Sequence, residues 1–447
     1  MRGETGWVGG RPRILIVGGG YVGLYAALGL AKGLGPEVEV TLVNPESFMV
    51  YPPFLPEAAS GNLEPRHVVV PLRTVLPRVR VITGEVTALD HGRRVARVRP
   101  SAGGSYDVAY DVVVVAPGAV SRALPVPGLA EQGIGFKSVA EAIYLRNQVL
   151  SRMDAAESTT DERTRLHALT FLFVGGGYAG VEALAELEDL ARYACRHYRT
   201  VRREDMRWVL VEAATGLLPE IGRGLGAYAL ERLRRRGIEV HLNTRLESAV
   251  GGRMVLSDGE SFEAGTLVWT TGVRAHPLVA GLGFPVDERG RLIADEYLRV
   301  SAVEGAWTAG DCAAVPDLTT GGTCPPTAQH ALRQGPPPRE EPRRHASRPR
   351  PRPVPVPEPR AVGFPRTLQG GRLGPRDQGP RLPRLVPASD VPRHAHPDPQ
   401  PQGSRNRRLD AGALLPAGRG SARLAPASAR AVRARARTRG AELSDRG

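Results

Sequence analysis

Two glycine patterns are the parts of this chain best suited to hold a ligand. Each follows an apolar run and has the spacing Gly-x-Gly-x-x-Gly, and the second copy begins about 157 residues after the first. The two sets are Gly18, Gly20 and Gly23, and Gly175, Gly177 and Gly180. In such a turn the first glycine permits a sharp bend, the second lets the backbone approach a pyrophosphate, and the third lets the next helix pack closely. The N–H groups and the positive dipole end of that helix then bind phosphate.

The elements expected around the first turn are those of a nucleotide-binding unit. A single glycine pattern also occurs where glycine only permits packing, but its recurrence here favours two bound dinucleotides. Residues 13–17 predict a strand, residues 21–33 a helix and residues 38–44 the next parallel strand. An acidic residue often ends that second strand and holds the adenosine ribose, and Asn44 stands there instead. The Asn44 amide can still bind a ribose hydroxyl, and we expect its replacement by Asp to tighten ligand binding or leave it unchanged.

The second unit repeats this order with an acid at the end of its second strand. Residues 207–212 predict that strand, and Glu212 is placed to accept hydrogen bonds from both hydroxyls of an adenosine ribose. A 2′-phosphate at that position would meet a carboxylate, which favours NADH over NADPH. The interval from Gly175 to Glu212 is 37 residues, against 26 in the first unit, so we expect a longer helix or loop within it.

Three further segments point to a flavin in the first unit. Residues 111–118 predict a buried parallel strand whose end, at Gly118, passes near the first dinucleotide. Residues 305–312 predict a strand that delivers Asp311 to a helix start, where its carboxylate can take a ribityl hydroxyl. The helix expected at residues 327–334 would face the flavin ring with its N-terminus and stabilise negative charge there.

Four other segments complete the expected architecture. Residues 51–61 are too rich in proline to predict a helix start, and their apolar character indicates packing against a flat buried surface, either a flavin or ordinary protein. Residues 79–100 alternate as an antiparallel insert does. Residues 138–149 predict a helix, and residues 151–166 a polar connection into the second unit.

Charge and aromatic residues divide the chain at residue 335. Residues 335–447 contain 24 Arg, no Lys and 9 acidic residues, a net charge of +15, whereas the whole chain carries +14. Of the 23 Phe, Tyr and Trp residues, 22 precede Gly335, so we expect the last segment to lack a core and to be disordered. The three Cys residues have no metal-ligand spacing, so we expect no metal site. No run of about 20 apolar residues predicts a membrane span.

With these pieces in order, residues 12–334 resemble the two-dinucleotide flavoprotein reductases, and most closely the type II NADH dehydrogenases. Those enzymes are single-subunit, FAD-containing NADH:quinone oxidoreductases bound peripherally to membranes. The motifs that carry the resemblance are Gly-Gly-Gly-Tyr-Ala-Gly-Val-Glu at 175–182, Leu-Val-Trp-Thr-Thr-Gly-Val at 267–273, Thr-Ala-Gly-Asp at 308–311 and Ala-Gln-His-Ala-Leu-Arg-Gln at 328–334.

The resemblance implies an α/β fold with two Rossmann-like dinucleotide-binding domains, the NAD domain being inserted in the FAD domain. The implied limits are residues 12–125 and 276–334 for the FAD domain and 126–275 for the NADH domain, followed by the Pro/Arg-rich segment 335–447. The residues implied for FAD are Gly18, Gly20, Gly23, Asn44, Gly118 and Asp311, and those for NADH are Gly175, Gly177, Gly180 and Glu212.

The resemblance also implies two catalytic side chains. Glu182 would lie where nicotinamide and quinone meet the flavin and would relay a proton, and Gln329 would hydrogen-bond a quinone carbonyl. The position four residues after Gln329, often Gln or Glu in the family, is Arg333 here, with Gln334 next to it. The implied partner is a quinone, and the implied location is cytoplasmic, peripheral to the inner face of the cell membrane. A homodimer stays open.

Other interpretations stay open beside this one. No Cys precedes Cys195, so electrons cannot leave through a dithiol near the flavin. A soluble FAD-dependent reductase with a protein or small-molecule acceptor fits the same motifs. The Arg-rich segment has no aromatic stacking platform, so it could bind nucleic acid only nonspecifically.

The origin of residues 335–447 also has two interpretations. They are either a natural segment or the product of a reading-frame shift near codon 335, because 58 Arg against 2 Lys indicate a GC-rich gene. In the second case we expect the chain to bind FAD weakly or to aggregate through the exposed flavin-side surface, and not to dock on membranes as the family does.

Overall fold

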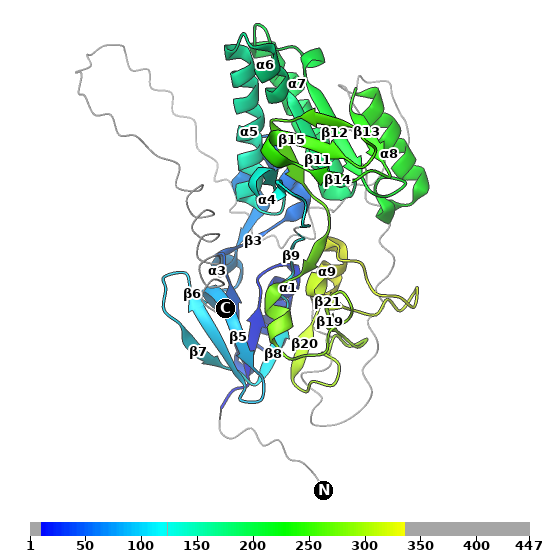
Figure 1. Cartoon of the computed structure of the whole chain (residues 1–447). Coiled ribbons are helices and arrows are strands. Elements are labelled where there is room, and N and C mark those ends of the chain that lie inside the picture. Colours follow the sequence, from blue (N-terminus) through cyan, green and yellow to red (C-terminus); the bar gives the residue numbers. More distant parts are fainter. Residues whose placement is uncertain (1–9, 123, 336–447) are drawn as a thin grey trace, which may run out of the picture. The chain divides into compact units, whose positions relative to one another are not determined.

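The computed structural model describes residues 10–122 and 124–335, which Figure 1 shows as helices and sheets. These residues all belong to one of the two units into which the chain divides. The Pro/Arg-rich segment 335–447 lies outside the described residues except for Gly335. Its expected disorder and the reading-frame shift therefore stay predictions.

A seven-stranded sheet carries the first glycine turn. Its strands, in order across the sheet, are β20 (Ala306–Thr308), β8 (Val112–Val115), β1 (Arg13–Val17), β2 (Glu39–Asn44), β5 (Arg80–Asp90), β6 (Val95–Pro100) and β7 (Tyr106–Ala109). The strands from β20 to β5 pair in parallel, and β5, β6 and β7 pair antiparallel. The antiparallel part confirms the insert predicted at residues 79–100. The parallel part is largely buried because its strands are nearly continuous apolar runs.

A five-stranded parallel sheet carries the second glycine turn. Its strands, in order, are β10 (Gly133–Ile134), β17 (Thr266–Trp269), β11 (Thr170–Val174), β12 (Arg207–Glu212) and β13 (Glu239–Leu242). The seven-stranded sheet takes strands from both sides of this stretch of chain, so the second Rossmann-like unit is inserted in the first, as predicted. The limits 12–125, 126–275 and 276–334 stay predictions.

The described residues also contain four small sheets and nine α-helices. The remaining strands are β14 (Leu246–Ser248), β15 (Arg253–Leu256) and β16 (Ser261–Glu263) in one sheet, β18 (Val273–Ala275) with β9 (Ala119–Ser121), β19 (Leu292–Ile293) with β21 (Ala313–Ala314), and β3 (Phe48–Val50) with β4 (Val69–Pro71). The helices are α1 (Tyr21–Gly33), α2 (Leu55–Ala59), α3 (Leu72–Val75), α4 (Leu129–Gln132), α5 (Val139–Ser158), α6 (Glu162–Ala168), α7 (Tyr178–Ala194), α8 (Arg223–Arg235) and α9 (Ala328–Gln334). None of these described helices has both the length and the apolar character that crossing a membrane requires.

The two helices that leave the glycine turns begin where the sequence predicts. α1 covers residues 21–33 and buries an apolar face that includes Leu24 and Leu30 against the sheet. α7 has 17 residues against 13 in α1, and the connection after it, residues 195–206, is longer than the connection after α1, residues 34–38. Together they account for the longer interval between Gly175 and Glu212. Each helix begins one residue after the second glycine of its turn, so its first N–H groups face the turn.

Two sequence expectations were wrong. The proline-rich segment 51–61 does contain helix: a 3-10 turn at Pro52–Phe54 leads into α2, with proline at the first positions of each. Proline is tolerated there because the first N–H groups of a helix have no intrahelical partner. Residues 151–166 are not a polar connection, since α5 continues to Ser158 and α6 follows, capped by Asp161. The polar residues cover the solvent face of α5, whereas Met153 on its other face is fully buried.

The short helix α2 joins the first unit to the core of the second. It contacts α5 and α7. Leu55 and Ala59 of α2 share one apolar cluster with Leu145 of α5 and Leu184 of α7. The segment between β3 and β4 is therefore fixed by the inserted unit rather than by its own sheet.

Candidate active site

The first glycine turn joins β1 to α1 with the geometry that its spacing predicts. Gly18 has φ +99°, a left-handed value that favours glycine, and a Cβ there would lie 2.3 Å from the Ala116 oxygen. A Cβ on Gly23 would lie 1.8 Å from the Gly18 oxygen, so α1 packs directly on the turn. A Cβ on the exposed Gly20 would meet no atom within 4 Å. The open space that a pyrophosphate needs therefore lies over the second glycine.

The second turn, between β11 and α7, repeats this arrangement. Gly175 has φ +118°, and a Cβ there would lie 2.6 Å from the Thr270 Oγ1. A Cβ on Gly180 would lie 1.9 Å from the Gly175 oxygen, whereas a Cβ on Gly177 would meet no atom within 4 Å. In both turns the outer glycines permit packing and the middle one leaves room for a ligand.

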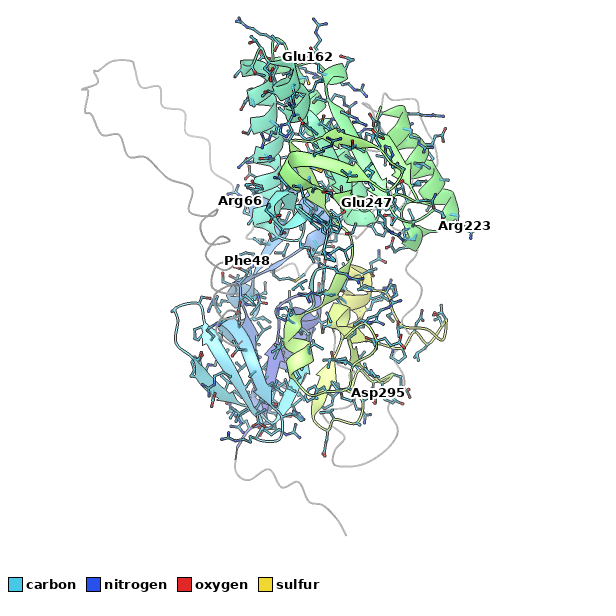
Figure 2. All side chains as sticks on the ribbon, in the orientation of Figure 1. Phe48, Arg66, Glu162, Arg223, Glu247 and Asp295 are labelled. Carbon is cyan, nitrogen blue, oxygen red and sulfur yellow. The ribbon has the colours of Figure 1, made fainter. Side chains whose placement is uncertain are left out.

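Asn44 ties the end of β2 to the first turn. Its Oδ1 accepts a hydrogen bond from the Gly19 N–H at 2.7 Å. Its Nδ2 donates to the carbonyl oxygens of Glu46, at 2.8 Å, and Phe48, at 3.4 Å; Phe48 is labelled in Figure 2. Both amide hydrogens are therefore engaged within the chain, and only Oδ1 keeps a lone pair for a ribose hydroxyl.

Glu212 holds the corresponding place at the end of β12. Its Oε2 accepts a hydrogen bond from the Gly176 N–H, and its Oε1 accepts one from the Ala214 N–H at 2.7 Å. The side chain is half-buried, and each carboxylate oxygen has further acceptor capacity. Glu212 can therefore hold the turn and accept from ribose hydroxyls at once.

Gly118 and Asp311 lie at the carboxyl ends of the neighbouring strands β8 and β20. Gly118 turns the chain with φ +72°, and Asp311 lies in the 3-10 turn Gly310–Cys312. Burial raises the pKa of the Cys312 thiol in this turn to about 11, and the thiol donates to the Val115 carbonyl oxygen at the end of β8, with 3.6 Å between sulfur and oxygen. The half-buried Asp311 accepts no hydrogen bond from the described residues, so its carboxylate has capacity for a ribityl hydroxyl.

The helix after this turn, α9, places its two Gln residues differently. Gln329 lies in its first turn, half-buried, and forms no hydrogen bond with the described residues. Gln334, at the other end, is 5% exposed, and its Oε1 accepts a hydrogen bond from the Gly310 N–H at 2.8 Å. Gln334 therefore holds the backbone beside Asp311, a role that its spacing from Gln329 did not predict.

Glu182 lies on α7, in the second turn of the helix, and is half-buried. Loss of hydration is the largest cause that raises its pKa to about 8, and the negative charges of Glu57 and Glu186 act in the same direction. A carboxyl group with that pKa keeps its proton at neutral pH. Glu182 can therefore store a proton, as its predicted role requires.

The acidic neighbours of Glu182 were missed in the sequence analysis. Glu186 lies one turn further along α7, and Glu57 lies in α2. The Glu186 Oε2 accepts hydrogen bonds from Ser60 Oγ at 2.8 Å and from Asn62 Nδ2 at 2.9 Å. An acid within the apolar face of α7 was the one available signal, because a buried carboxylate requires a partner. Nothing local indicated that the partners follow α2.

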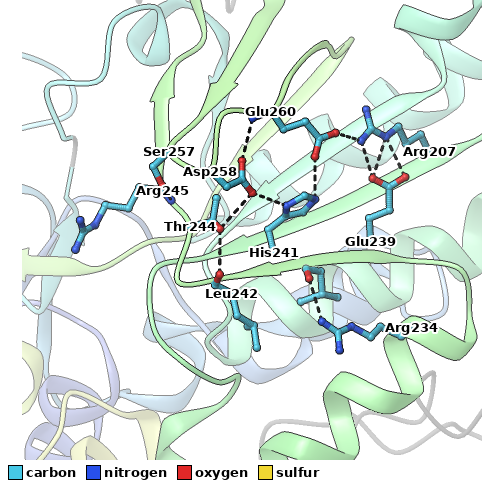
Figure 3. Close-up of polar contacts among 11 residues, drawn as sticks. Arg207, Arg234, Glu239, His241, Leu242, Thr244, Arg245, Ser257, Asp258 and Glu260 are labelled. Carbon is cyan, nitrogen blue, oxygen red and sulfur yellow. Dashed lines mark hydrogen bonds and ion pairs between the residues drawn. The ribbon is translucent and has the colours of Figure 1, made fainter.

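A polar network at the far edge of the five-stranded sheet is the described grouping most similar to a metal site (Figure 3). Ligand atoms of Glu239, His241 and Glu260 lie within 4.8 Å of one another. Arg207 donates to both of these carboxylates, at 2.6 Å to Glu239 and 2.5 Å to Glu260, and His241 Nδ1 lies 2.9 Å from Asp258. A guanidinium already occupies the position of a cation, so this cluster joins β12, β13 and the β15–β16 hairpin as an ion-pair network.

Comparisons with known proteins agree with this arrangement. The pyridine nucleotide-disulphide oxidoreductase family profile matches residues 12–335. The type II NADH:quinone oxidoreductase NdhA of Mycobacterium tuberculosis is 31% identical over 74% of this chain and 71% of its own length. A type II NADH:quinone oxidoreductase of Staphylococcus aureus is 31% identical over 73% of this chain and 80% of its own. Among solved structures, NDH2 of Plasmodium falciparum in complex with NADH gives a TM-score of 0.68 at 18% identity, over 73% of this chain and 82% of its own.

The matched region coincides with the two Rossmann-like units. At 18% identity, the structural similarity supports the fold alone. The family profile and the relatives at 31% identity carry the assignment. The chain belongs to the pyridine nucleotide-disulphide oxidoreductase family and, within it, to the type II NADH:quinone oxidoreductases.

Proposed function

We propose that this chain is an FAD-dependent enzyme that oxidises NADH and reduces a quinone. The observation that carries the proposal is the pair of equivalent glycine turns, each with open space over its middle glycine. The helix that leaves one turn packs beside the half-buried Asp311, since a Cβ on the adjacent Gly310 would lie 3.0 Å from Val22 of α1. The other turn opens the helix that bears Glu182. Two dinucleotide sites and one proton-holding carboxyl group are what this reaction requires.

The residues proposed to hold FAD fit that cofactor. Gly20 leaves room for the pyrophosphate, and Asn44 Oδ1 has a lone pair for a ribose hydroxyl. Asp311 accepts no hydrogen bond from the described residues, and it follows β20, the neighbour of β8, at the strand ends where a ligand of this fold binds. When bound, FAD would supply the two-electron chemistry that joins NADH to a quinone.

The residues proposed to hold NADH are in the second turn. Gly177 leaves room for its pyrophosphate, with Gly175 and Gly180 packing the turn. Glu212 would accept from the hydroxyls of the adenosine ribose and would repel a 2′-phosphate. The same residue therefore positions the nucleotide and selects NADH.

Glu182 and Gln329 are the proposed catalytic residues. The overall reaction converts NADH, a quinone and one proton to NAD⁺ and a quinol, so one proton must come from outside NADH. The Glu182 carboxyl group holds a proton at neutral pH, since its pKa is raised to about 8. The Gln329 side-chain N–H groups are available to donate to a quinone carbonyl. The protein would thus contribute position, a proton and a hydrogen bond.

The location and the oligomeric state of the enzyme are further parts of the proposal. We propose a cytoplasmic enzyme, peripheral to the inner face of the cell membrane, and a homodimer as its assembly. Sedimentation with lipid vesicles and light scattering of the purified protein test these two proposals. Binding that needs residues 335–447 would favour a natural C-terminal segment, and protein that stays free of vesicles would favour the soluble alternative.

The test of the function is an anaerobic titration followed by absorption. Purified protein should be yellow, NADH should bleach the flavin band, and an added quinone should restore it. Colourless folded protein would contradict FAD binding. Bleaching by NADH that only a redox protein or a small dye reverses would support the alternative acceptor instead.

A further inference from the structure

Lys137 is a half-buried lysine in a chain whose positive charges are almost all arginine. The sequence contains 58 Arg but only 2 Lys, Lys32 and Lys137. Lys32 is exposed in the last turn of α1, whereas Lys137 is half-buried just before α5. An ammonium group is compact, has three donors and can lose its proton when buried, and none of this holds for guanidinium. A buried lysine in an arginine-rich chain therefore requires a local explanation.

Both ends of Lys137 are fixed. Its backbone N–H donates to Glu141 Oε2 at 2.8 Å, within the capping box that begins α5 at Ser138. Its Nζ donates to the Ala119 carbonyl oxygen at 3.2 Å. Ala119 directly follows Gly118, so the lysine reaches from the start of α5 to the turn proposed to hold FAD.

The same turn leads to Asp311. β9, which begins at Ala119, pairs with β18, and β18 contacts the 3-10 turn that contains Asp311. Loss of hydration lowers the pKa of Lys137, and the charges of Asp311 and then Glu141 oppose that shift. Loss of hydration raises the pKa of Asp311, and the charge of Lys137 opposes it. The contact of Lys137 with Ala119 is thus joined through β9 and β18 to the turn that holds Asp311, and the opposite charges of the two side chains favour their ionised forms.

We propose that Lys137 is a cationic group of the FAD site. Its ammonium group would offset the negative charge of the Asp311 carboxylate and stabilise the negative charge of the reduced flavin. This inference rests on the proposed function. Two electrons and one proton from NADH add one negative charge to the flavin, and a nearby ammonium favours that state. The Ala119 carbonyl uses one of three ammonium donors, which leaves two for Asp311 and the cofactor. Lys137 acts here as a positioning and electrostatic residue.

The test compares the midpoint potential of bound FAD in four proteins by dye equilibration. These are wild type, Lys137→Met, Lys137→Arg and Lys32→Met. We expect Lys137→Met to weaken binding of reduced relative to oxidised flavin by about tenfold, which is about 30 mV for a two-electron couple. Lys137→Arg keeps the charge and should change the affinity for reduced relative to oxidised flavin by less than about threefold. Lys32→Met removes the same charge at the surface and should leave the potential unchanged.

Midpoint potentials measured over a pH series separate the effect of the Lys137 charge from the effect of the side chain's shape. The groups that act on Lys137 are Asp311 from the 3-10 turn and Glu141 from α5. Because its pKa is lowered from 10.5, the difference between wild type and Lys137→Met should be largest at low pH and narrow as the pH rises toward 10.5. Equal potentials in all four proteins, or equal shifts in Lys137→Arg and Lys137→Met, would overturn the proposal. Absence of bound FAD in wild type would instead contradict the proposed function.

Discussion

The Glu212 carboxylate accepts a hydrogen bond from the backbone N–H of Gly176, inside the second glycine turn. Asn44 accepts the equivalent bond from Gly19 in the first turn. The end of the second strand thus fixes the loop that faces the phosphates, in both units. Only Glu212 brings a negative charge to this place, and the two sites should differ accordingly.

Replacing Glu212 by Ser should reduce the preference for NADH over NADPH. Loss of the charge contact, worth roughly 1.4 to 3 kcal/mol, would change the ratio of kcat/KM values by one to two orders of magnitude. The ratio should be measured from initial rates with both nucleotides and one quinone. Glu212→Gln is the matched control, because it keeps an acceptor for the turn and removes the charge. A ratio unchanged in both variants would show that Glu212 does not face the ribose.

Gly177→Ala and Gly180→Ala should separate ligand binding from folding. A Cβ on Gly177 enters open space, so this variant should fold, retain FAD and bind NADH roughly tenfold more weakly. A Cβ on Gly180 would lie 1.9 Å from the Gly175 oxygen, so that variant should lose about 1 to 3 kcal/mol of stability or more. Thermal unfolding and NADH titration together measure both effects. Similar unfolding in the two variants would contradict the assigned roles.

The sequence alone predicted the elements around each turn because their signals are local. Glycine spacing, apolar runs and an acid at a strand end lie within about 40 residues of each other, and the fold keeps them together. The helix at 51–61 was missed because proline lowers helix propensity, although it is harmless in the first turn. The length of α5 was missed because its polar side chains cover one face of a partly buried helix.

The contacts that modify the site could not be predicted in this way. Ser60 binds Glu186 across 126 residues, and Lys137 reaches Ala119 across 18 residues. Such contacts depend on how α2 and α5 pack, and no periodicity or spacing encodes that packing. Gln334 is a similar case, because its partner Gly310 is fixed by the sheet.

Asn44→Asp should weaken FAD binding, contrary to the expectation from sequence. The Asp carboxylate could still accept from the Gly19 N–H, but its other oxygen would face the carbonyl oxygens of Glu46 and Phe48. Two donated hydrogen bonds would be replaced by repulsion, at a cost of about 1 to 3 kcal/mol. FAD retention during dialysis and thermal unfolding measure the loss. Tighter FAD binding in the variant would show that a ribose contact outweighs the internal bonds.

Glu182→Gln should slow quinone reduction roughly 100-fold or more, and flavin reduction by NADH much less, because a positioned proton donor contributes that much to the step it serves. Stopped-flow traces of the two half-reactions measure this difference. In wild type, quinone reduction should fall as the pH rises through about 8, where Glu182 loses its proton, and this limb should be absent in the variant. Equal slowing of both half-reactions would rule out a role limited to the quinone.

Glu186→Gln is the matched control on the same helix. It keeps an acceptor for Ser60 and Asn62 but removes a negative charge that raises the pKa of Glu182. The fall in the rate of quinone reduction should therefore move to lower pH without disappearing.

The pH dependence of stability gives a second check on Glu182. Because its folded-state pKa lies above the ordinary value of 4.5, its protonated form stabilises the fold fully below about pH 4.5, and this contribution is lost as the pH rises to about 8. As the pH rises from 5 to 9, urea unfolding should therefore show the free energy of unfolding of Glu182→Gln increasing relative to that of wild type. If the free energies of the two proteins change in parallel with pH, Glu182 is already ionised at neutral pH.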